Sequence, residues 1–382
     1  MRKISDTIAR LAALHARSAG ELSGAESGQN RLRPLNEFGF NPGALKGSCY
    51  VPKNLPDSCP LVVVLHGCTQ TAAGYDHHSG WSRLADEAGF ALLYPEQQRG
   101  NNPNLCFNWF IPGDTQRHSG EVASIRQMIE RVVLAHSLDR ARVFVSGLSA
   151  GGAMAASMLA TYPEVFAGGA IIAGLAHGSA TNVPEAFDRM RGHGLPLEMQ
   201  LQRSLREASD HDGPWPKLSI WQGTDDRTVA PCNAEALAAQ WRGVHHLSEE
   251  PASTRVSGAL TRHVWRKASG EAIIEVNMIA GMGHGAPVTA DLGTAGPFML
   301  DVGISSTREI AAFWGVSNLE GQLRPQASEH PSSKAWSPRA GQPGKALAPQ
   351  PTAVPRPRSP APEPSGAQKT IEDALRAAGL MR

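Results

Sequence analysis

The sequence has no long uninterrupted apolar run. Its longest, over residues 165–176, includes three glycines, whereas a helix that spans a membrane needs about 18 or more consecutive apolar residues. It also has no surplus charge, with 36 Lys and Arg against 35 Asp and Glu. These absences exclude a spanning helix and give no electrostatic reason to expect a nucleic acid or a membrane surface as a partner.

Cysteine is sparse and odd in number, with 5 residues in 382. Such a set does not form a disulfide scaffold, and no group of Cys and His has the spacing of a zinc site. The sequence therefore predicts no metal and no cofactor. One disulfide fits an exported protein, and none fits a reducing cytosol. The cysteines are Cys49, Cys59, Cys68, Cys106 and Cys232.

The first residues do not resemble an export signal, which needs an apolar run of about 7–15 residues. Asp6, Arg10 and Arg17 interrupt the sequence where that run should be. This pattern favours a cytoplasmic protein. Residues 1–36 are expected to form a short amphipathic helix, or a loosely ordered terminus, followed by a polar linker.

The last residues are rich in proline. Residues 325–364 contain eleven prolines and almost no large apolar side chains, so they cannot bury enough surface to offset the entropy of ordering. We predict a disordered linker over residues 319–368. Residues 369–382 are expected to form a short amphipathic helix or a frayed tail.

Residues 37–318 alternate between apolar β-branched runs and helical patterns. Continuous apolar runs are typical of strands that are covered on both faces. The alternation predicts an α/β fold, with a doubly wound, mostly parallel sheet and helices on both faces. The expected strands are residues 61–65, 90–94, 142–145, 170–172, 218–221 and 272–278, and the expected helices are residues 81–88, 121–135, 150–161 and 233–241.

Residues 175–215 break this alternation. They mix Gly, Pro and charged residues around one helical pattern near residues 184–191. We expect this segment to be an insertion over the carboxyl edge of the sheet, where ligands bind in such folds.

The central chemical signal is the GxSxG pentapeptide of residues 147–151, which includes Leu148, Ser149 and Ala150. It lies between an expected strand and a helix of small residues, which is the setting of a nucleophile elbow. Glycines leave room for such a strained turn, and a helix amino terminus favours developing negative charge. The pattern predicts Ser149 as a nucleophile. The alternative is a serine that only caps the helix.

An attacking serine needs donors for the oxyanion that forms. The elbow fold supplies one from the residue after the nucleophile, here Ala150, and another from the loop after an earlier strand. Cys68 follows the expected strand at residues 61–65 and is the second candidate. His66, at the end of that strand, suits a structural histidine better than a catalytic base.

The acid should follow a later strand, and the base should come last. Asp225 and Asp226 both lie in the loop after residues 218–221, and either qualifies. His284 lies in a glycine-rich loop after the last expected strand. The chain order of serine, carboxylate and histidine predicts a catalytic triad.

These segments together resemble the polyhydroxybutyrate depolymerase family of esterases, over residues 41–314. The resemblance implies an α/β-hydrolase fold and a serine esterase with Ser149, Asp226 and His284 as its triad. It also implies an oxyanion site at Cys68, and in exported members a Cys68–Cys106 disulfide and an extracellular location. It rests on residues 65–70, 104–110, 147–152, 221–226 and 283–285.

We therefore expect a serine esterase for small ester or oligoester substrates of the short-chain or hydroxyalkanoate type. Acetyl or feruloyl carbohydrate esters are the closest alternative, and a hydrolase-fold module that binds without catalysis is the alternative of another class. The oligomeric state stays open. Trp109 and Trp221 are candidates for binding the substrate, with Phe107 and Phe110 beside Trp109, although such aromatic residues also pack in cores.

Overall fold

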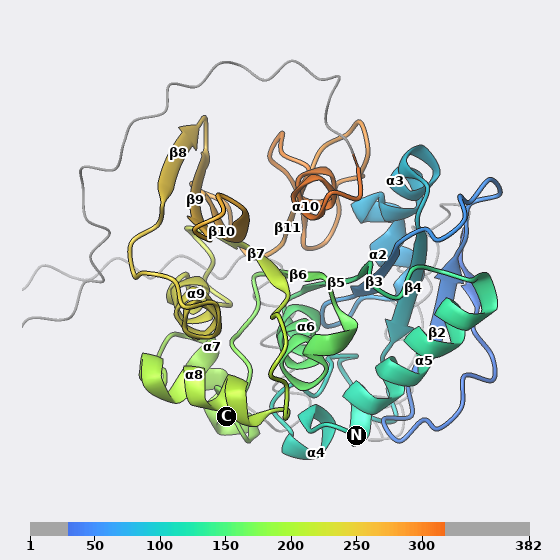
Figure 1. Cartoon of the computed structure of the whole chain (residues 1–382), viewed down its shortest axis with the longest axis horizontal. Coiled ribbons are helices and arrows are strands. Elements are labelled where there is room, and N and C mark those ends of the chain that lie inside the picture. Colours follow the sequence, from blue (N-terminus) through green and yellow to red (C-terminus); the bar gives the residue numbers. More distant parts are fainter. Residues whose placement is uncertain (1–29, 318–382) are drawn as a thin grey trace, which may run out of the picture.

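A mixed ten-stranded sheet runs through the part of the chain that the structure describes, residues 30–317 of a computed structural model (Figure 1). The helix and most of the linker expected within residues 1–36 lie outside the described residues. The linker and helix expected over residues 319–382 lie outside them as well.

The centre of the sheet is parallel and its two margins are antiparallel. Strands β4, β3, β5, β6, β7 and β10 pair in parallel in that order, β2 and β1 extend one edge, and β9 and β8 extend the other. Their bounds are β1 (Arg33–Pro34), β2 (Lys46–Tyr50), β3 (Leu61–Leu65), β4 (Ala91–Glu96), β5 (Val143–Leu148), β6 (Gly168–Ile172), β7 (Lys217–Gly223), β8 (Ser253–Ser257), β9 (Leu260–Arg266) and β10 (Ala272–Ile279).

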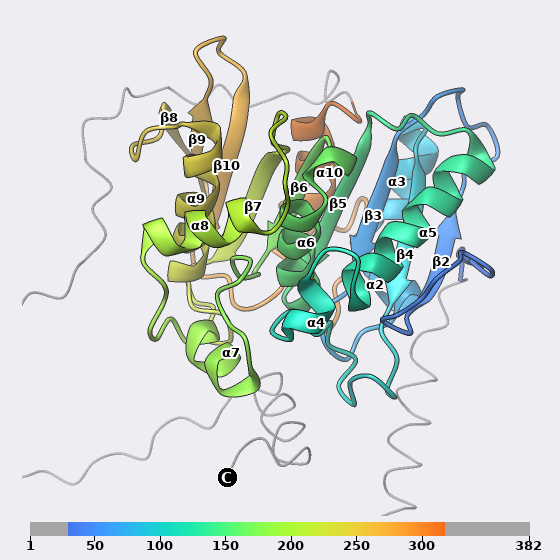
Figure 2. The same ribbon diagram turned by 60° about the horizontal axis from the view of Figure 1, so that its bottom comes forward.

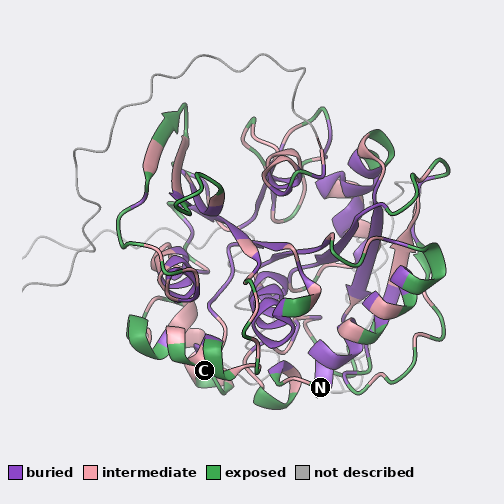
Figure 3. Cartoon of the chain, in the orientation of Figure 1, coloured by how far each residue is buried: buried purple, intermediate pink, exposed green. Residues whose placement is uncertain are grey.

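Helices cover both faces of the sheet, because its central strands are apolar on both sides. All five residues of β3 are buried, and they alternate between two apolar clusters. Figures 1 and 2 show the two layers, and Figure 3 shows the buried strands between them. One layer holds α2 (Ala72–Ser79), α3 (Trp81–Ala88) and α10 (Ser306–Trp314), and the other holds α5 (Gly120–His136), α6 (Ala150–Thr161), α8 (Glu198–Glu207) and α9 (Cys232–His245).

The predicted doubly wound sheet is confirmed, and most expected elements match within two or three residues. The sequence did not reveal α2, α8, α10 or the antiparallel hairpin of β8 and β9. In α2 the buried positions include Asp76, which accepts hydrogen bonds from Ser82 and Tyr94. A buried carboxylate interrupts the apolar pattern by which an amphipathic helix is found.

Residues 175–215, which were expected to form an insertion, contain two helices that lie in different parts of the fold. Helix α7 (Val183–Met190) borders a cavity at the carboxyl edge of the sheet. It begins where Asn182 accepts a hydrogen bond from the Glu185 N–H and where Pro184 occupies the first turn, as helix starts favour. Helix α8 packs against α9 in one of the covering layers instead. The shorter elements are α4 (Pro112–Thr115), β11 (Ala286–Val288) and β12 (Met299–Asp301).

Candidate active site

Ser149 lies in a tight turn between β5 and α6. Its backbone has φ 56° and ψ −117°, a sparsely populated region for a residue with a side chain. A Cβ atom at Gly147 would lie 2.2 Å from the Gly151 carbonyl oxygen, and one at Gly151 would lie 2.4 Å from the carbonyl oxygens of Leu65 and His66. The two glycines are therefore required by the close approach of the turn to itself and to β3.

Three polar side chains meet at this turn. His284 Nε2 lies 3.0 Å from Ser149 Oγ, and His284 Nδ1 lies 2.7 Å from Asp226 Oδ2. Because a carboxylate only accepts hydrogen bonds, Nδ1 carries the ring proton and Nε2 is left to accept the serine hydroxyl proton. The side chains of His284 and Asp226 are 8% and 0% exposed, so little water competes for these contacts.

Asp226, rather than Asp225, contacts the ring of His284. Asp226 Oδ1 accepts hydrogen bonds from the backbone N–H groups of Thr228 and Val229, both at 2.8 Å, and Gln222 donates to Oδ2. These donors fix the direction of the Asp226 carboxyl group. Asp225 is exposed, and within residues 30–317 its side chain bonds only with the neighbouring Thr224 hydroxyl.

The loops that carry the acid and the histidine are joined to each other. They follow β7 and β10, which are paired in parallel. The Asp225 N–H donates to the Met282 carbonyl at 3.0 Å, and the Gly281 N–H donates to the Thr224 hydroxyl at 2.9 Å. This cross-bonding holds Asp226 and His284 at a constant separation.

Cys68 and Ala150 both line the cavity beside Ser149. Within residues 30–317, neither backbone N–H donates a hydrogen bond. The loop that carries Cys68 is held by Gln70, which accepts from the Gly67 N–H at 2.8 Å, and by the Thr69 N–H, which donates to the Asn104 carbonyl at 2.7 Å. Two residues that line the cavity beside the serine thus have backbone N–H groups without a partner among the described residues.

A disulfide joins Cys68 to Cys106, with 4.2 Å between the two Cα atoms. It ties the loop after β3 to the loop of residues 97–111. This is the pairing that the family resemblance implied. Cys49, Cys59 and Cys232 are free thiols.

His66 does not take part in the contacts of Ser149. Its ring is buried, Nδ1 lies 2.8 Å from the Gly67 carbonyl oxygen, and Nε2 accepts a hydrogen bond from the Gln97 N–H at 3.1 Å. Burial lowers the pKa of His66, which keeps the ring neutral. The preference for a structural histidine is consistent with this placement.

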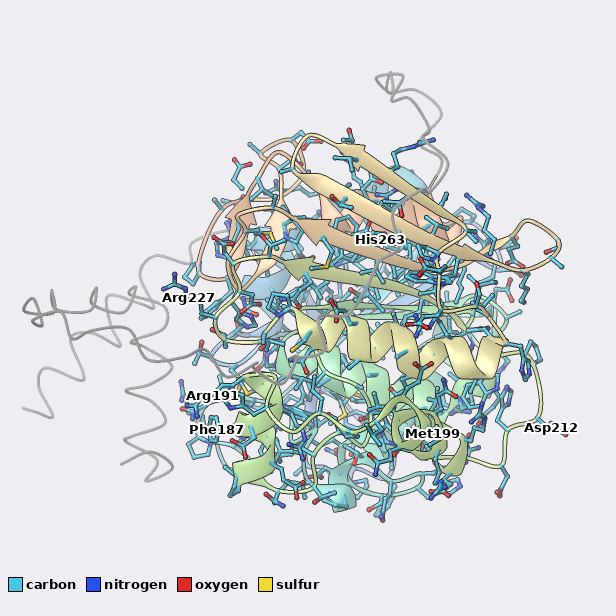
Figure 4. The ribbon with its side chains drawn as sticks, turned by 90° about the vertical axis from the view of Figure 1, so that its left-hand side faces the viewer. Phe187, Arg191, Met199, Asp212, Arg227 and His263 are labelled. Atoms are coloured by element: carbon cyan, nitrogen blue, oxygen red, sulfur yellow. A yellow bond between two sulfur atoms is a disulfide. The ribbon has the colours of Figure 1, made fainter. Side chains whose placement is uncertain are left out.

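The cavity in front of Ser149 has a volume of about 350 Å³. Its polar wall consists of four asparagines in the loop of residues 97–111, which are Asn101, Asn102, Asn104 and Asn108. Its apolar wall comes from α7, from residues 109–111 of the same loop and from residues of other elements. Figure 4 shows that Phe187 of α7, Arg191 directly after α7, and Arg227 in the loop after β7 lie along the same side of the molecule. The apolar lining includes Trp109, Phe110, Ile111, Leu148, Leu175, Val183, Ala186, Phe187, Met190, Val229 and Phe298.

The four aromatic candidates separate into two groups. Trp109 and Phe110 line the cavity, whereas Phe107 is fully buried beneath it against His66. The expectation for Trp221 is wrong. Its side chain packs in the layer of α2, α3 and α10, where its indole N–H donates to Ser219, because side chains of a strand alternate between the two faces of the sheet.

Sequence reasoning missed the contribution of α7. Val183, Ala186, Phe187 and Met190 line the cavity at the spacing i, i+3, i+4, i+7, which is the apolar stripe of an amphipathic helix. That periodicity was a usable signal. Phe298 also lines the cavity, and its ring lies 6.0 Å from the ring of His284 between centroids. No sequence pattern indicated this position.

Residues 30–317 contain neither a candidate metal site nor a candidate membrane-spanning helix. No group of three or more His, Cys, Asp or Glu side chains is arranged to hold a metal ion. No helix in this range has both the length and the apolar composition to cross a membrane.

Comparisons with known proteins agree on one family. The family model described as "Esterase PHB depolymerase" matches residues 47–264. Poly(3-hydroxyalkanoate) depolymerase C of Paucimonas lemoignei is 44% identical over 292 residues, 75% of this chain and 70% of the relative. An acetylxylan esterase of Coprinopsis cinerea is 31% identical over 264 residues, 67% of this chain and 70% of the relative.

Among solved structures, an acetyl xylan esterase from Aspergillus awamori superposes with a TM-score of 0.65 at 23% identity, covering 75% of this chain and 99% of that one. At this level of identity the likeness establishes the fold alone. It agrees with the α/β-hydrolase arrangement of sheet, elbow and helices.

Proposed function

Because the chain belongs to the PHB depolymerase family of esterases, we propose that it hydrolyses short-chain and hydroxyalkanoate-type carboxylic esters through an acyl-enzyme on Ser149. The observation that carries this proposal is the contact series from Asp226 through His284 to Ser149, at 2.7 Å and 3.0 Å. A hydroxyl becomes an effective nucleophile when an adjacent, oriented base accepts its proton.

In the proposed reaction, Ser149 Oγ attacks the ester carbonyl carbon while His284 Nε2 accepts the hydroxyl proton. Asp226 holds the imidazole in the tautomer that accepts at Nε2 and stabilises the imidazolium that forms. The N–H groups of Cys68 and Ala150 bind the oxyanion. Each such donor contributes about 10²–10³ to turnover in comparable enzymes.

The same histidine then completes both halves of the reaction. The imidazolium gives its proton to the alcohol oxygen, the ester bond breaks, and the alcohol leaves. Water attacks the acyl-enzyme with His284 as general base, which releases the carboxylic acid and restores the Ser149 hydroxyl. Atoms and protons balance without any cofactor.

The apolar wall of the cavity supports a hydroxyalkanoate-type substrate, because it suits the alkyl part of an acyl chain. The 44% identity to a poly(3-hydroxyalkanoate) depolymerase favours the same substrate class.

Substitution of the serine tests the reaction. We expect Ser149→Ala to reduce hydrolysis of 4-nitrophenyl butyrate to background and to abolish labelling by a fluorophosphonate probe. The control is Ser146→Ala in β5, the strand that precedes Ser149, since Ser146 is buried and its hydroxyl has no hydrogen-bond partner within the described residues. Activity that survives in a folded Ser149→Ala protein would contradict the acyl-enzyme, and a wild type that resists the probe would favour a non-catalytic module.

The substrate class needs a separate comparison. The kcat/KM of the wild type should be higher for a hydroxybutyrate dimer or trimer than for acetylated xylo-oligosaccharides or feruloyl esters. The reverse ranking would leave Ser149 as the nucleophile and would overturn the hydroxyalkanoate assignment.

A further inference from the structure

A buried carboxylate that the proposed reaction does not use lies behind the polar wall of the cavity. Glu121 occupies the first turn of α5 and is 1% exposed. Gln97 Nε2 donates to its Oε1, and the Asn108 N–H donates to its Oε2 at 2.9 Å. Among the described residues, no Lys, Arg or His forms an ion pair with it. Burying a carboxyl group costs free energy of folding unless hydrogen bonds compensate for the lost water.

Gln97 links Glu121 to the loop of residues 97–111 through hydrogen bonds. Both amide hydrogens of its side chain are used, one by Glu121 and one by the Cys106 carbonyl at 3.1 Å. Its Oε1 accepts from the Gln98 N–H at 2.8 Å and from Asn101 Nδ2 at 2.9 Å. Every polar atom of the Gln97 amide therefore has a partner, and Glu121 Oε1 is one of the four groups that fix the direction of this amide.

The first route from Gln97 to the oxyanion site passes through His66. The Gln97 N–H donates to His66 Nε2 at 3.1 Å, so the ring proton resides on Nδ1. Nδ1 lies 2.8 Å from the Gly67 carbonyl oxygen and therefore donates to it. The bond between His66 and Gly67 thus has one defined direction.

That bond orients the donor of the oxyanion site. The Gly67 carbonyl and the Cys68 N–H belong to one peptide unit, and a trans peptide places the two groups on opposite sides. The described residues contain no cis peptide bond. The Gln70 N–H also donates to the Gly67 carbonyl, at 3.3 Å. With that carbonyl held toward the buried ring of His66, the Cys68 N–H is turned away from the ring, and Cys68 itself borders the cavity.

The second route is covalent. Gln97 holds the Cys106 carbonyl, and Cys106 is bonded through its sulfur to Cys68. Asn108, two residues further, is held by Glu121 directly. Both routes begin at Glu121 and end at the same residue of the oxyanion loop.

We propose that Glu121 is a positioning residue that orients the Cys68 N–H toward the oxyanion through Gln97 and His66. The inference rests on the proposed function, since it needs an oxyanion to form in front of Ser149. It assigns to the buried carboxylate an effect on the transition state rather than on substrate binding, because the ester carbonyl acquires full negative charge only after attack.

The test is Glu121→Gln, which keeps the shape of the side chain. It replaces one oxygen, which can accept a hydrogen bond whether or not the carboxyl group is protonated, by an NH₂ group that cannot accept. We expect kcat for 4-nitrophenyl butyrate to fall by about 10-fold to 100-fold, within the effect of one oxyanion donor, while KM changes less than about twofold. The inhibition constant of an alkyl trifluoromethyl ketone, which forms a tetrahedral oxyanion on the serine, should rise by the same factor as kcat falls.

The matched control is Asp76→Asn, which removes a second buried carboxylate from the opposite layer. Asp76 accepts hydrogen bonds from Ser82 and Tyr94 and does not border the cavity. It should lower the melting temperature while leaving kcat unchanged. A fall in kcat equal to that of Glu121→Gln would mean general destabilisation and would overturn the proposal.

The remaining outcomes are also decisive. If Glu121→Gln does not fold, Glu121→Asp withdraws the carboxylate by one methylene and should change kcat and the ketone constant in the same direction. Unchanged values for both in a folded variant overturn the role of Glu121. The role of Ser149 is unaffected by that result, since the proposed function fails only if Ser149→Ala retains activity.

Discussion

The reacting groups and the walls of the cavity are held by different means. Ser149, Asp226 and His284 each follow within a few residues of the end of a central parallel strand. Hydrogen bonds join the loops of Asp226 and His284. The walls come largely from α7, which is separated from β6 by ten residues, and from the long loop of residues 97–111 after β4. Side-chain hydrogen bonds and one disulfide hold the second of these.

This difference indicates a division of roles. Groups at strand ends inherit their separation from the sheet, so they suit chemistry that tolerates little displacement. Loops and a peripheral helix tolerate changes of size and polarity, so they suit selection of the substrate. Changes at the strand ends should therefore affect turnover, and changes in the walls should affect preference.

The largest expected effect is at the acid. Asp226→Asn should lower kcat by about 10³-fold to 10⁴-fold, because the amide no longer holds His284 in the tautomer that accepts the serine proton. Steady-state kinetics with 4-nitrophenyl butyrate measure the change. Asp225→Asn, the neighbouring exposed residue, should stay within about twofold of the wild type. Equal losses in the two variants would refute the assignment of Asp226.

The next effect concerns the contact between the two regions. Cys106→Ala opens the disulfide, which closes a segment with a sequence separation of 38, and should lower the free energy of unfolding by about 4 kcal/mol. It should also lower kcat by about tenfold, since the Cys68 loop loses its covalent tie to the 97–111 loop. Urea denaturation and kinetics measure both, and Cys49→Ala is the control at a free thiol. Full activity of a folded Cys106→Ala protein would show that the tie is only structural.

A smaller effect, on preference alone, is expected at α7. Phe187→Ala enlarges the apolar wall and should raise the kcat/KM ratio of octanoate to butyrate esters by about tenfold, while kcat for acetate stays near the wild-type value. Met199→Ala on α8 is the control, because Met199 is 76% exposed and does not line the cavity, and Figure 4 shows it away from Phe187. An unaltered ratio would remove α7 from the specificity wall.

The smallest effect is a pH dependence of stability. Burial, with a contribution from the carboxylate of Asp114, raises the pKa of Glu121 to about 8, above its ordinary value near 4.3 in an unfolded chain. The folded protein then binds more protons than the unfolded one between these values, so stability falls as pH rises from about 5 to 8. Melting temperatures across this range should decline less steeply in Glu121→Gln. A slope identical to the wild type would mean that Glu121 does not titrate there.

Much of this site was predictable because its chemistry imposes strict local patterns. Gly147 and Gly151 have no substitute where a Cβ would lie within 2.4 Å of a carbonyl oxygen, so the elbow is visible as a motif. The run of β3 is visible because both of its faces are covered. Strand ends of a parallel sheet meet at one edge, which is why Cys68, Asp226 and His284 could be assigned from their order along the chain.

The failures have an equally physical cause. Trp221 lies near the end of β7, the strand that Asp226 follows, but the alternation of side chains along the strand turns it to the other face of the sheet. Its position near a strand end does not reveal which face it takes. Helix α2 was missed because Asp76 is buried through its hydrogen bonds to Ser82 and Tyr94, which come from later elements. Glu121 in a predicted helix looked like an ordinary charged residue, since Gln97 and Asn108 are neighbours only after folding.

The sequence by itself determined the sheet, the elbow and the identity of the reacting groups, since each depends on local patterning and on the order of elements. The tertiary structure buried Asp226 and left Asp225 exposed, and it closed the Cys68–Cys106 disulfide that the resemblance implied. Only the tertiary structure assembled the cavity from α7 and four asparagines. Those outcomes depend on contacts between segments that are distant along the chain, and such contacts are set by packing across the whole domain rather than by any local pattern.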